Sequence, residues 1–173
     1  MSQKLENTMK KITIAKVVLN MGVGKSGEPI ERAKRALHQI SGQKPSARNA
    51  KATQRDWGVH KGEPIGVAVT LRKQPAIELI KRLLAAKGNQ LKSSSFDNFG
   101  NVSFGISEHI DIQGVKYDPN IGIVGLNISI SLARPGFNIR FRSKHKASVG
   151  RNHRIKSDEA KEFLTREFGV QVI

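Results

Sequence analysis

The clearest structural signal in the sequence is the strict alternation of apolar and polar residues over Leu126–Leu132. Because successive side chains of a strand point to opposite faces of a sheet, this pattern predicts a strand. Residues 101–106 alternate in the same way, and residues 65–71 alternate well enough to predict another strand. Residues 12–19 are mostly apolar and β-branched, which predicts a central strand, and residues 46–51 are a candidate short strand.

Three other segments carry the spacing of a helix with one apolar face. Residues 28–42 and 75–88 each have a proline in the first turn and a glycine at the end. Residues 157–169 begin with Ser157, the expected N-cap, and two acids that suit the positive end of a helix dipole. Strands and helices mix without strict repetition, which favours an α+β fold: a mostly antiparallel sheet with helices packed on one face. At 173 residues we expect a single domain, with long mobile loops at about 52–64 and 134–156.

The charge of the chain is strongly unbalanced, with 30 Lys+Arg against 14 Asp+Glu and a formal net charge of +16. Like charges repel one another in a compact chain, so this excess is typical of a protein that binds RNA, DNA or an anionic membrane surface. Residues 134–156 hold eight Lys/Arg and no acid, interleaved with aromatic and aliphatic residues, which predicts a loop that becomes ordered on RNA. Residues 93–133 hold one cation against four acids, so we expect a second kind of partner.

Several function classes find no support. Residues 1–11 are polar, without the apolar core of a signal peptide, and no stretch approaches the roughly 20 apolar residues of a membrane span. We therefore expect a cytoplasmic protein with no membrane partner. The chain has no Cys, which excludes disulfides, thiolate zinc sites and thiol nucleophiles. The histidines do not stand at metal-ligand spacing, and the Glu108-His109 pair near Asp111 has no nucleophile beside it. We expect no metal, no cofactor and no enzyme activity.

One motif suggests an enzyme nonetheless. Gly22-Val-Gly24-Lys-Ser-Gly27 is a GxGxxG pattern between a predicted strand and a predicted helix, which is the context of a dinucleotide site. Such a site also needs an acid about 20 residues further on, and none stands there. A glycine-rich turn is the simpler interpretation. A nucleotide-dependent enzyme that uses this loop, and a general basic nucleic-acid packaging protein, remain as alternatives.

Five sequence blocks occur in an order that resembles one protein family. They are Val18-Leu-Asn20-Met-Gly-Val-Gly24, Ile40-Ser-Gly-Gln43-Lys-Pro45, Gly66-Val-Ala-Val-Thr70-Leu-Arg72, Asn98-Phe-Gly-Asn-Val-Ser-Phe-Gly-Ile106 and His109-Ile-Asp-Ile with Lys116-Tyr-Asp-Pro119. Together they resemble the large-subunit ribosomal protein family that binds 5S rRNA, the fifth in the standard numbering. The resemblance covers nearly the whole chain. Arg134-Pro-Gly136 and Val149-Gly-Arg-Asn-His153 resemble its archaeal–eukaryotic form.

This resemblance implies a non-catalytic protein of the central protuberance that attaches 5S rRNA to the large-subunit rRNA. It also implies contacts with the peptidyl-site tRNA and with a small-subunit protein. The positions that match the family's 5S rRNA-binding sheet face are Asn20, Gln43, Thr70 and Arg72. Amides and hydroxyls can hydrogen-bond RNA sugars and base edges, and the arginine adds a phosphate contact.

The family's tRNA-facing loop matches residues 52–61, which we expect to be mobile in the free protein. Its candidate residues are Lys51, Arg55, Trp57, His60 and Lys61, where the indole either stacks on a base or packs into the domain. The candidates for binding large-subunit rRNA or 5S rRNA are Arg134, Arg140, Arg142, Lys144, Lys146, Arg151 and Arg154. The expected contact with a basic small-subunit protein involves Glu108, Asp111 and Asp118.

Overall fold

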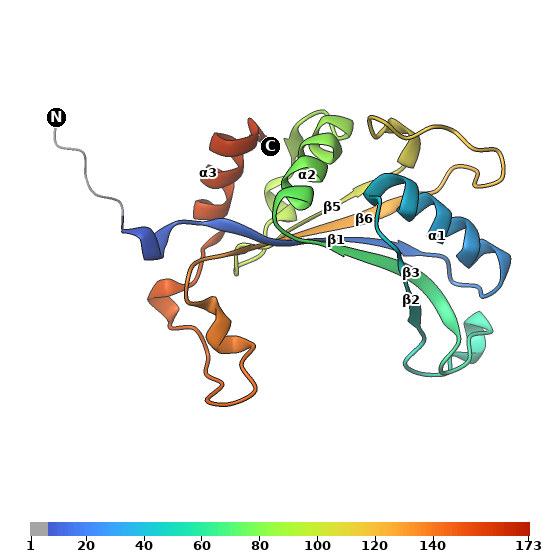
Figure 1. The fold of residues 1–173 in the computed structure, drawn as a ribbon, viewed down its shortest axis with the longest axis horizontal. Helices are drawn as coiled ribbons and strands as arrows, with labels where there is room; N and C mark the ends of the chain where they lie inside the picture. Colours follow the sequence, from blue (N-terminus) through green and yellow to red (C-terminus); the bar gives the residue numbers. More distant parts are fainter. Residues whose placement is uncertain (1–6) are drawn as a thin grey trace.

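The computed structural model describes residues 7–173, and its regular elements form one main sheet, three α-helices and a small strand pair (Figure 1). The predicted absence of a signal peptide rests partly on residues 1–6, which lie outside the described residues. The elements in chain order are β1 (Thr13–Gly22), α1 (Glu28–Ser41), β2 (Ser46–Asn49), β3 (Pro64–Leu71), α2 (Gln74–Ala86), β4 (Gln90–Leu91), β5 (Val102–Ile106), β6 (Leu126–Ala133), α3 (Ser157–Phe168) and β7 (Gln171–Val172).

The main sheet has five strands in the order β2-β3-β1-β6-β5, and every pairing in it is antiparallel. The predicted central strand is therefore central, because β1 pairs with β3 on one side and with β6 on the other. The short strands β4 and β7, which the sequence did not suggest, form a separate parallel pair. No helix among the described residues is both long and apolar enough to cross a membrane.

The three helices lie on one side of the sheet, as Figure 1 shows, and the core fills the space between them. On β1 the buried positions are Val17, Leu19 and Met21, which alternate with more exposed ones. The side chains that α1 buries against the sheet are Ile30, Ala33, Ala36, Leu37 and Ile40. The predicted α+β fold, with helices on one face of an antiparallel sheet, is thus confirmed.

The helix ends follow the predicted signals, with one correction at α3. Gly42 closes α1 in the left-handed conformation at φ 66°, and its N–H donates to the carbonyl oxygen of His38 at 2.8 Å. At α3 the N-cap is Lys156 rather than Ser157, which is already the first helical residue. The reason is that the Glu159 carboxylate reaches back and accepts the backbone N–H of Lys156 at 3.0 Å, which fixes the start of the helix one residue earlier.

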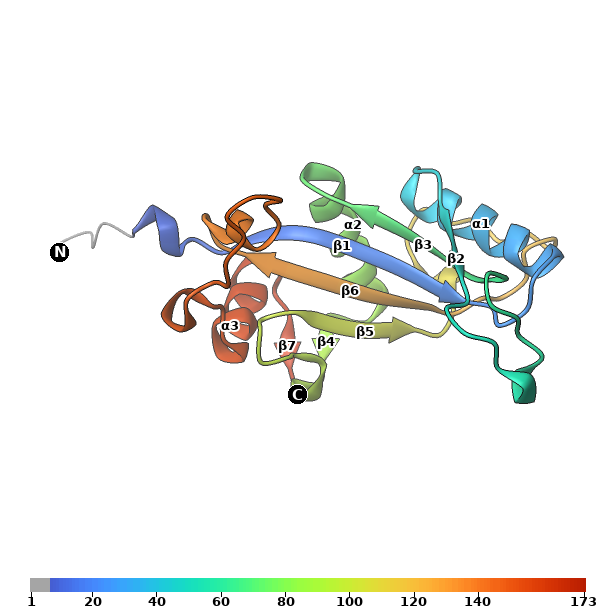
Figure 2. The same ribbon diagram turned by 90° about the horizontal axis from the view of Figure 1, so that it is seen from below.

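Both long loops project on the side of the sheet that carries no helix, at opposite ends of it (Figures 1 and 2). The loop before β3 contains a short 3₁₀ turn, Arg55–Trp57, closed by a backbone bridge between Gln54 and Val59. The loop after β6 contains two such turns, Phe137–Arg140 and Arg151–His153. The predicted mobility of these loops in the free protein stays a prediction.

Candidate nucleic-acid interface

The side of the sheet without helices presents a polar surface, which we call the open face. It is produced by the alternation within the strands, since the residues between the buried ones must point away from the core. The polar residues of the five strands on this face are Thr13, Lys16, Asn20, Ser46, Arg48, Thr70, Ser103, Asn127, Ser129 and Ser131. The five strands contain no Asp or Glu, so no carboxylate of theirs repels a polyanion from this face.

The register of the strands arranges these groups in rows across the sheet. Asn20 of β1 lies between Ala68 of β3 and Asn127 of β6, and Ser46 of β2 continues the same row. One step along the strands, Val18 lies between Thr70 and Ser129, whose hydroxyl is hydrogen-bonded to that of Ser103 at 3.2 Å. Amide and hydroxyl groups therefore extend across the full width of the sheet.

Two of the four predicted 5S rRNA-binding residues lie together on the open face. Asn20 and Thr70 are diagonal neighbours on adjacent strands, because Asn20 pairs with Ala68 and Thr70 is two residues further on. Arg72 directly follows the last residue of β3 and is exposed. Gln43 is exposed too, but it stands in the connection between α1 and β2, where its backbone N–H donates to the Ser41 hydroxyl at 3.2 Å.

Most residues of the open face were not predicted from the sequence. Ser103, Asn127 and Ser129 were not singled out, although they occupy the polar positions of the very strands whose alternation was recognised. The two cations of the face, Lys16 and Arg48, were missed as well. These residues could have been predicted from the alternation of the strands. Once the apolar positions are assigned to the core, every polar position between them must face solvent.

The loop before β3 places its candidate residues in solvent. Lys51, Arg55, His60 and Lys61 are exposed. Trp57 is 78% exposed, so its indole does not pack into the core, and what it contacts in a complex stays a prediction. The base of the loop is fixed by Val59, which is buried, and by a pair of backbone hydrogen bonds between Val59 and Gln54 at 2.9 and 3.1 Å.

In the loop after β6 five of the predicted cations are exposed and Arg154 is partly buried; the exposed ones are Arg140, Arg142, Lys144, Lys146 and Arg151. These cations and those of the loop before β3 place positive charge at both ends of the open face (Figure 2). The chain segment that contains them includes no acid between residues 134 and 156.

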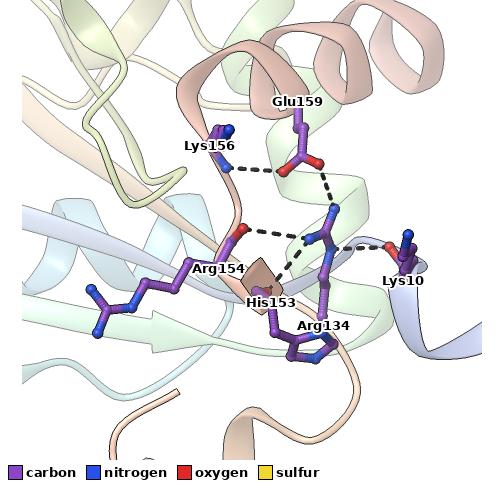
Figure 3. Close-up of polar contacts among 6 residues, drawn as sticks. All are labelled: Lys10, Arg134, His153, Arg154, Lys156 and Glu159. Carbon is purple, nitrogen blue, oxygen red and sulfur yellow. Dashed lines mark hydrogen bonds and ion pairs between the residues drawn. The ribbon is translucent and has the colours of Figure 1, made fainter. Parts of the chain in front are cut away.

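Arg134 does not belong with these cations, and its assignment as an RNA-binding residue is corrected here. Its side chain is 8% exposed and its guanidinium is surrounded by acceptors of the protein itself (Figure 3). Nε donates to the carbonyl of Lys10 at 3.1 Å, Nη1 to the carbonyls of His153 at 3.5 Å and Arg154 at 3.4 Å, and Nη2 to the Glu159 carboxylate at 2.8 Å. Arg134 therefore joins the N-terminal segment, the basic loop and α3.

The Glu159 carboxylate is the anionic centre of this joint. Its partial burial alone would raise its pKa, but the hydrogen bonds from the Lys156 N–H and from Arg134, with the positive charges of both residues, outweigh burial and lower the pKa below its ordinary value. The carboxylate is thus ionised at neutral pH and bound at both oxygens. The basic loop is anchored to α3 through it.

The predicted protein-contact residues lie on the other side of the molecule. The segment that contains Glu108, Asp111 and Asp118 is on the helix side of the sheet, as Figure 1 shows in yellow. It is attached there by hydrogen bonds from Gln39 of α1 to the carbonyl of Lys116, 3.0 Å, and from Arg82 of α2 to that of Gln113, 2.8 Å. Glu108 and Asp111 are exposed, and Asp118 is partly buried.

The two motifs that suggested an enzyme, the Glu108-His109 pair and the Gly22–Gly27 loop, both make contacts within the fold. His109 is buried, and its Nδ1 accepts the N–H of Val124 at 3.3 Å. In the glycine-rich loop, the N–H groups of Val23 and Gly24 both donate to the carbonyl of Ile65 at 2.9 Å, which occupies donors that a phosphate would need. Ser26 donates to the Glu63 carboxylate, whose charge would repel a phosphate.

The hydrogen bond from Ser26, followed by that from the His60 N–H, lowers the pKa of Glu63, so this carboxylate is charged at neutral pH. Within residues 7–173, no cluster of three or more His, Cys, Asp or Glu side chains is placed to hold a metal ion.

Comparison with known proteins assigns the family. Residues 7–60 match the family model described as "Ribosomal protein L5", and residues 64–172 match the model described as "ribosomal L5P family C-terminus". The "Large ribosomal subunit protein uL5" of Nitrosopumilus maritimus is 70% identical over 172 residues, which is 99% of this chain and 99% of that protein.

Proteins with the same description from Cenarchaeum symbiosum and Sulfolobus acidocaldarius are 64% and 45% identical. The matches cover 95% and 98% of this chain, and 98% and 96% of the respective relatives. These relatives are archaeal, in agreement with the predicted archaeal–eukaryotic form. The chain therefore belongs to the ribosomal protein L5 family of the large ribosomal subunit.

Proposed function

We propose that this protein is a non-catalytic constituent of the cytoplasmic large ribosomal subunit that binds 5S rRNA on the open face and attaches it to the large-subunit rRNA. The observation that carries the proposal is the composition of that face: amides, hydroxyls and two cations on five strands without an acid. Such groups hydrogen-bond riboses and base edges, and lysines and arginines pair with phosphates. A nucleotide-dependent enzyme is disfavoured, because the glycine-rich loop uses its own donors within the fold.

Two further contacts are part of the proposal. The loop at residues 52–61 would face the peptidyl-site tRNA, with Arg55 pairing with phosphates and Trp57 offering a flat face to exposed bases. The acidic segment with Glu108 and Asp111 would meet a basic small-subunit protein. The location of that segment on the helix side supports this division, since it keeps carboxylates away from the face proposed to bind RNA.

The proposal is tested by measuring the affinity of the full chain for transcribed 5S rRNA over a series of salt concentrations. If binding neutralises several phosphates, the logarithm of the affinity falls linearly with the logarithm of the salt concentration, by somewhat under one unit per phosphate. Arg72→Ala should weaken binding by about 1–3 kcal/mol, because it removes a charge-assisted contact. Arg166→Ala, which removes an exposed arginine of α3, is the matched control and should change the affinity little.

A response to salt that stays flat would contradict the proposal. Equal losses for the two arginine variants would also contradict it, since they would show that only the net charge matters and not the face on which the charge lies.

A further inference from the structure

A hollow of about 750 Å³ lies between the basic loop and the turn at residues 97–101. Three phenylalanines line it: Phe137 is partly buried, and two are largely exposed, Phe99 at 58% and Phe141 at 73%. Buried Val149 and Ile155 line the hollow beside them. Phenylalanine is a large apolar residue, and two exposed rings at one concave site indicate a binding site for a ligand or a partner molecule.

The turn that carries Phe99 is fixed in place by the fold. One Asp97 carboxylate oxygen accepts the N–H of Phe99, and its other oxygen accepts the side-chain amide of Asn101 at 2.8 Å. Gly100 has a φ of +74°, and a Cβ there would lie 2.6 Å from the Ile155 side chain. The turn therefore packs directly against Ile155 in a conformation that favours glycine, and it presents the Phe99 ring from a rigid support.

Cations accompany both rings. The Arg140 guanidinium carbon is 5.5 Å from the centre of the Phe141 ring, and that of Arg154 is 5.9 Å from the centre of the Phe99 ring. Lys146 lines the same hollow. Arg154 contributes only its carbonyl to the joint around Arg134, and its guanidinium points away from that joint (Figure 3). None of the described residues that line the hollow is acidic.

We propose that this hollow binds an unpaired nucleotide that is extruded from rRNA. Its base would stack on the Phe99 or Phe141 ring, and the adjoining phosphates would contact Arg140, Lys146 and Arg154. The volume is in the range of sites for a small molecule, which suits one nucleotide and not a duplex. An acidic peptide would use the cations but would leave two exposed rings without a flat partner, so a nucleobase fits better. This inference rests on the proposed function, because the nucleotide is taken to be part of the bound rRNA.

The test uses the full chain and two fluorescein-labelled RNA probes, a hexaadenylate and an abasic hexamer with the same number of phosphates. The variant Phe99→Leu/Phe141→Leu removes the two exposed rings of the hollow, leaves the partly buried Phe137 in place and keeps both sites apolar. Both positions are exposed, so the fold should persist. It should bind the hexaadenylate about 5- to 100-fold more weakly than the wild type, which is the scale of base stacking on an aromatic ring. Binding of the abasic hexamer should be weaker and equal for both proteins.

Tyr117→Leu is the matched control, since it removes an exposed ring from the helix side and should leave both affinities unchanged. Lys146→Gln gives a second readout that needs no change to the aromatic residues: it should lower the salt dependence of hexaadenylate binding by about 0.7 in the log–log slope. The hollow is not a nucleotide site if the wild type binds both hexamers equally, or if the double variant binds the hexaadenylate as the wild type does.

A polyglutamate peptide is tested as a competitor at a concentration at which the abasic hexamer displaces no hexaadenylate. If the peptide displaces the hexaadenylate, the hollow binds an acidic protein partner and not a nucleotide. The proposed function fails separately, if the wild type binds 5S rRNA no better than an unrelated RNA of the same length. The comparison of the two hexamers shows whether the hollow binds a base, whether or not the protein prefers 5S rRNA.

Discussion

At the scale of single residues, Arg134 shows that a cation in a basic segment need not be available to RNA. Residues 134–156 contain eight Lys/Arg, and the sequence alone gives no reason to separate the first from the others. The distinction is made by tertiary contacts: four acceptors from the N-terminal segment, the basic loop and α3 converge on one guanidinium. An arginine is suited to this role because its planar group offers five donors with a fixed geometry.

Replacing Arg134 should therefore affect folding before it affects binding. Arg134→Met leaves three backbone carbonyls and a carboxylate without their donor, so we expect the free energy of unfolding to fall by about 2 kcal/mol. Arg142→Met, which removes an exposed cation of the same loop, should change it by less than about 0.5 kcal/mol. Urea denaturation of the two variants checks this. A stability loss at Arg142 equal to that at Arg134 would show that the joint in Figure 3 has no special role.

The same joint should make stability depend on pH. The pKa of Glu159 is lowered in the folded protein, so its contribution is fully present above the ordinary carboxylate pKa of about 4.3 and is lost as the pH falls through the lowered value. Glu159→Gln should accordingly be less stable than the wild type at pH 7, by about 1 kcal/mol for this partly exposed group. The difference should shrink between about pH 5 and pH 3. Urea unfolding across this range checks the sign, and a difference that grows as the pH falls would contradict it.

At the scale of elements, the sequence predicted all three helices and four strands of the main sheet from a clear apolar pattern or clear end signals, whereas β2 was only a candidate short strand. The correct parts include β1 as the central strand and the glycine stop of α1. The pair β4–β7 could not be predicted, since two-residue strands have no period, and their pairing depends on where α3 ends. The cap at Lys156 was missed for a related reason: lysine is a poor N-cap, and here the Glu159 carboxylate, three residues into the helix, accepts the backbone N–H of the cap residue.

The loop at residues 52–64 gives a prediction that one fluorophore can check. Trp57 is the only tryptophan of the chain and is 78% exposed, so the free protein should show the red-shifted emission of a solvated indole and strong quenching by acrylamide. Adding tRNA should reduce the quenching if the indole stacks on a base. A blue-shifted emission that is protected from the quencher in the free protein would contradict the exposed position.

At the scale of the whole molecule, the acidic segment and the two cationic loops lie on opposite sides of the sheet. The open face and the two cationic loops are on one side, and the acidic segment is on the other, where it is bound to α1 and α2. The sequence showed that charge was uneven along the chain, but it could not show on which side each segment lies, because that depends on the strand order and on the chain connections. For the same reason the hollow between residues 97–101 and the basic loop, which are far apart in sequence, could not be predicted.

The proposed binding of 5S rRNA by the open face can be tested with one pair of variants. Ser129→Glu puts a single negative charge in the middle of that face, and Ala85→Glu puts the same charge on an exposed position of α2 on the opposite side. The two proteins have the same net charge, so any difference between them reports the location of the charge. We expect Ser129→Glu to weaken 5S rRNA binding at least about 10-fold, through repulsion of phosphates and the lost hydroxyl, and Ala85→Glu to change it less than about 2-fold. Equal affinities for the two variants, measured at one salt concentration, would show that the open face does not bind 5S rRNA.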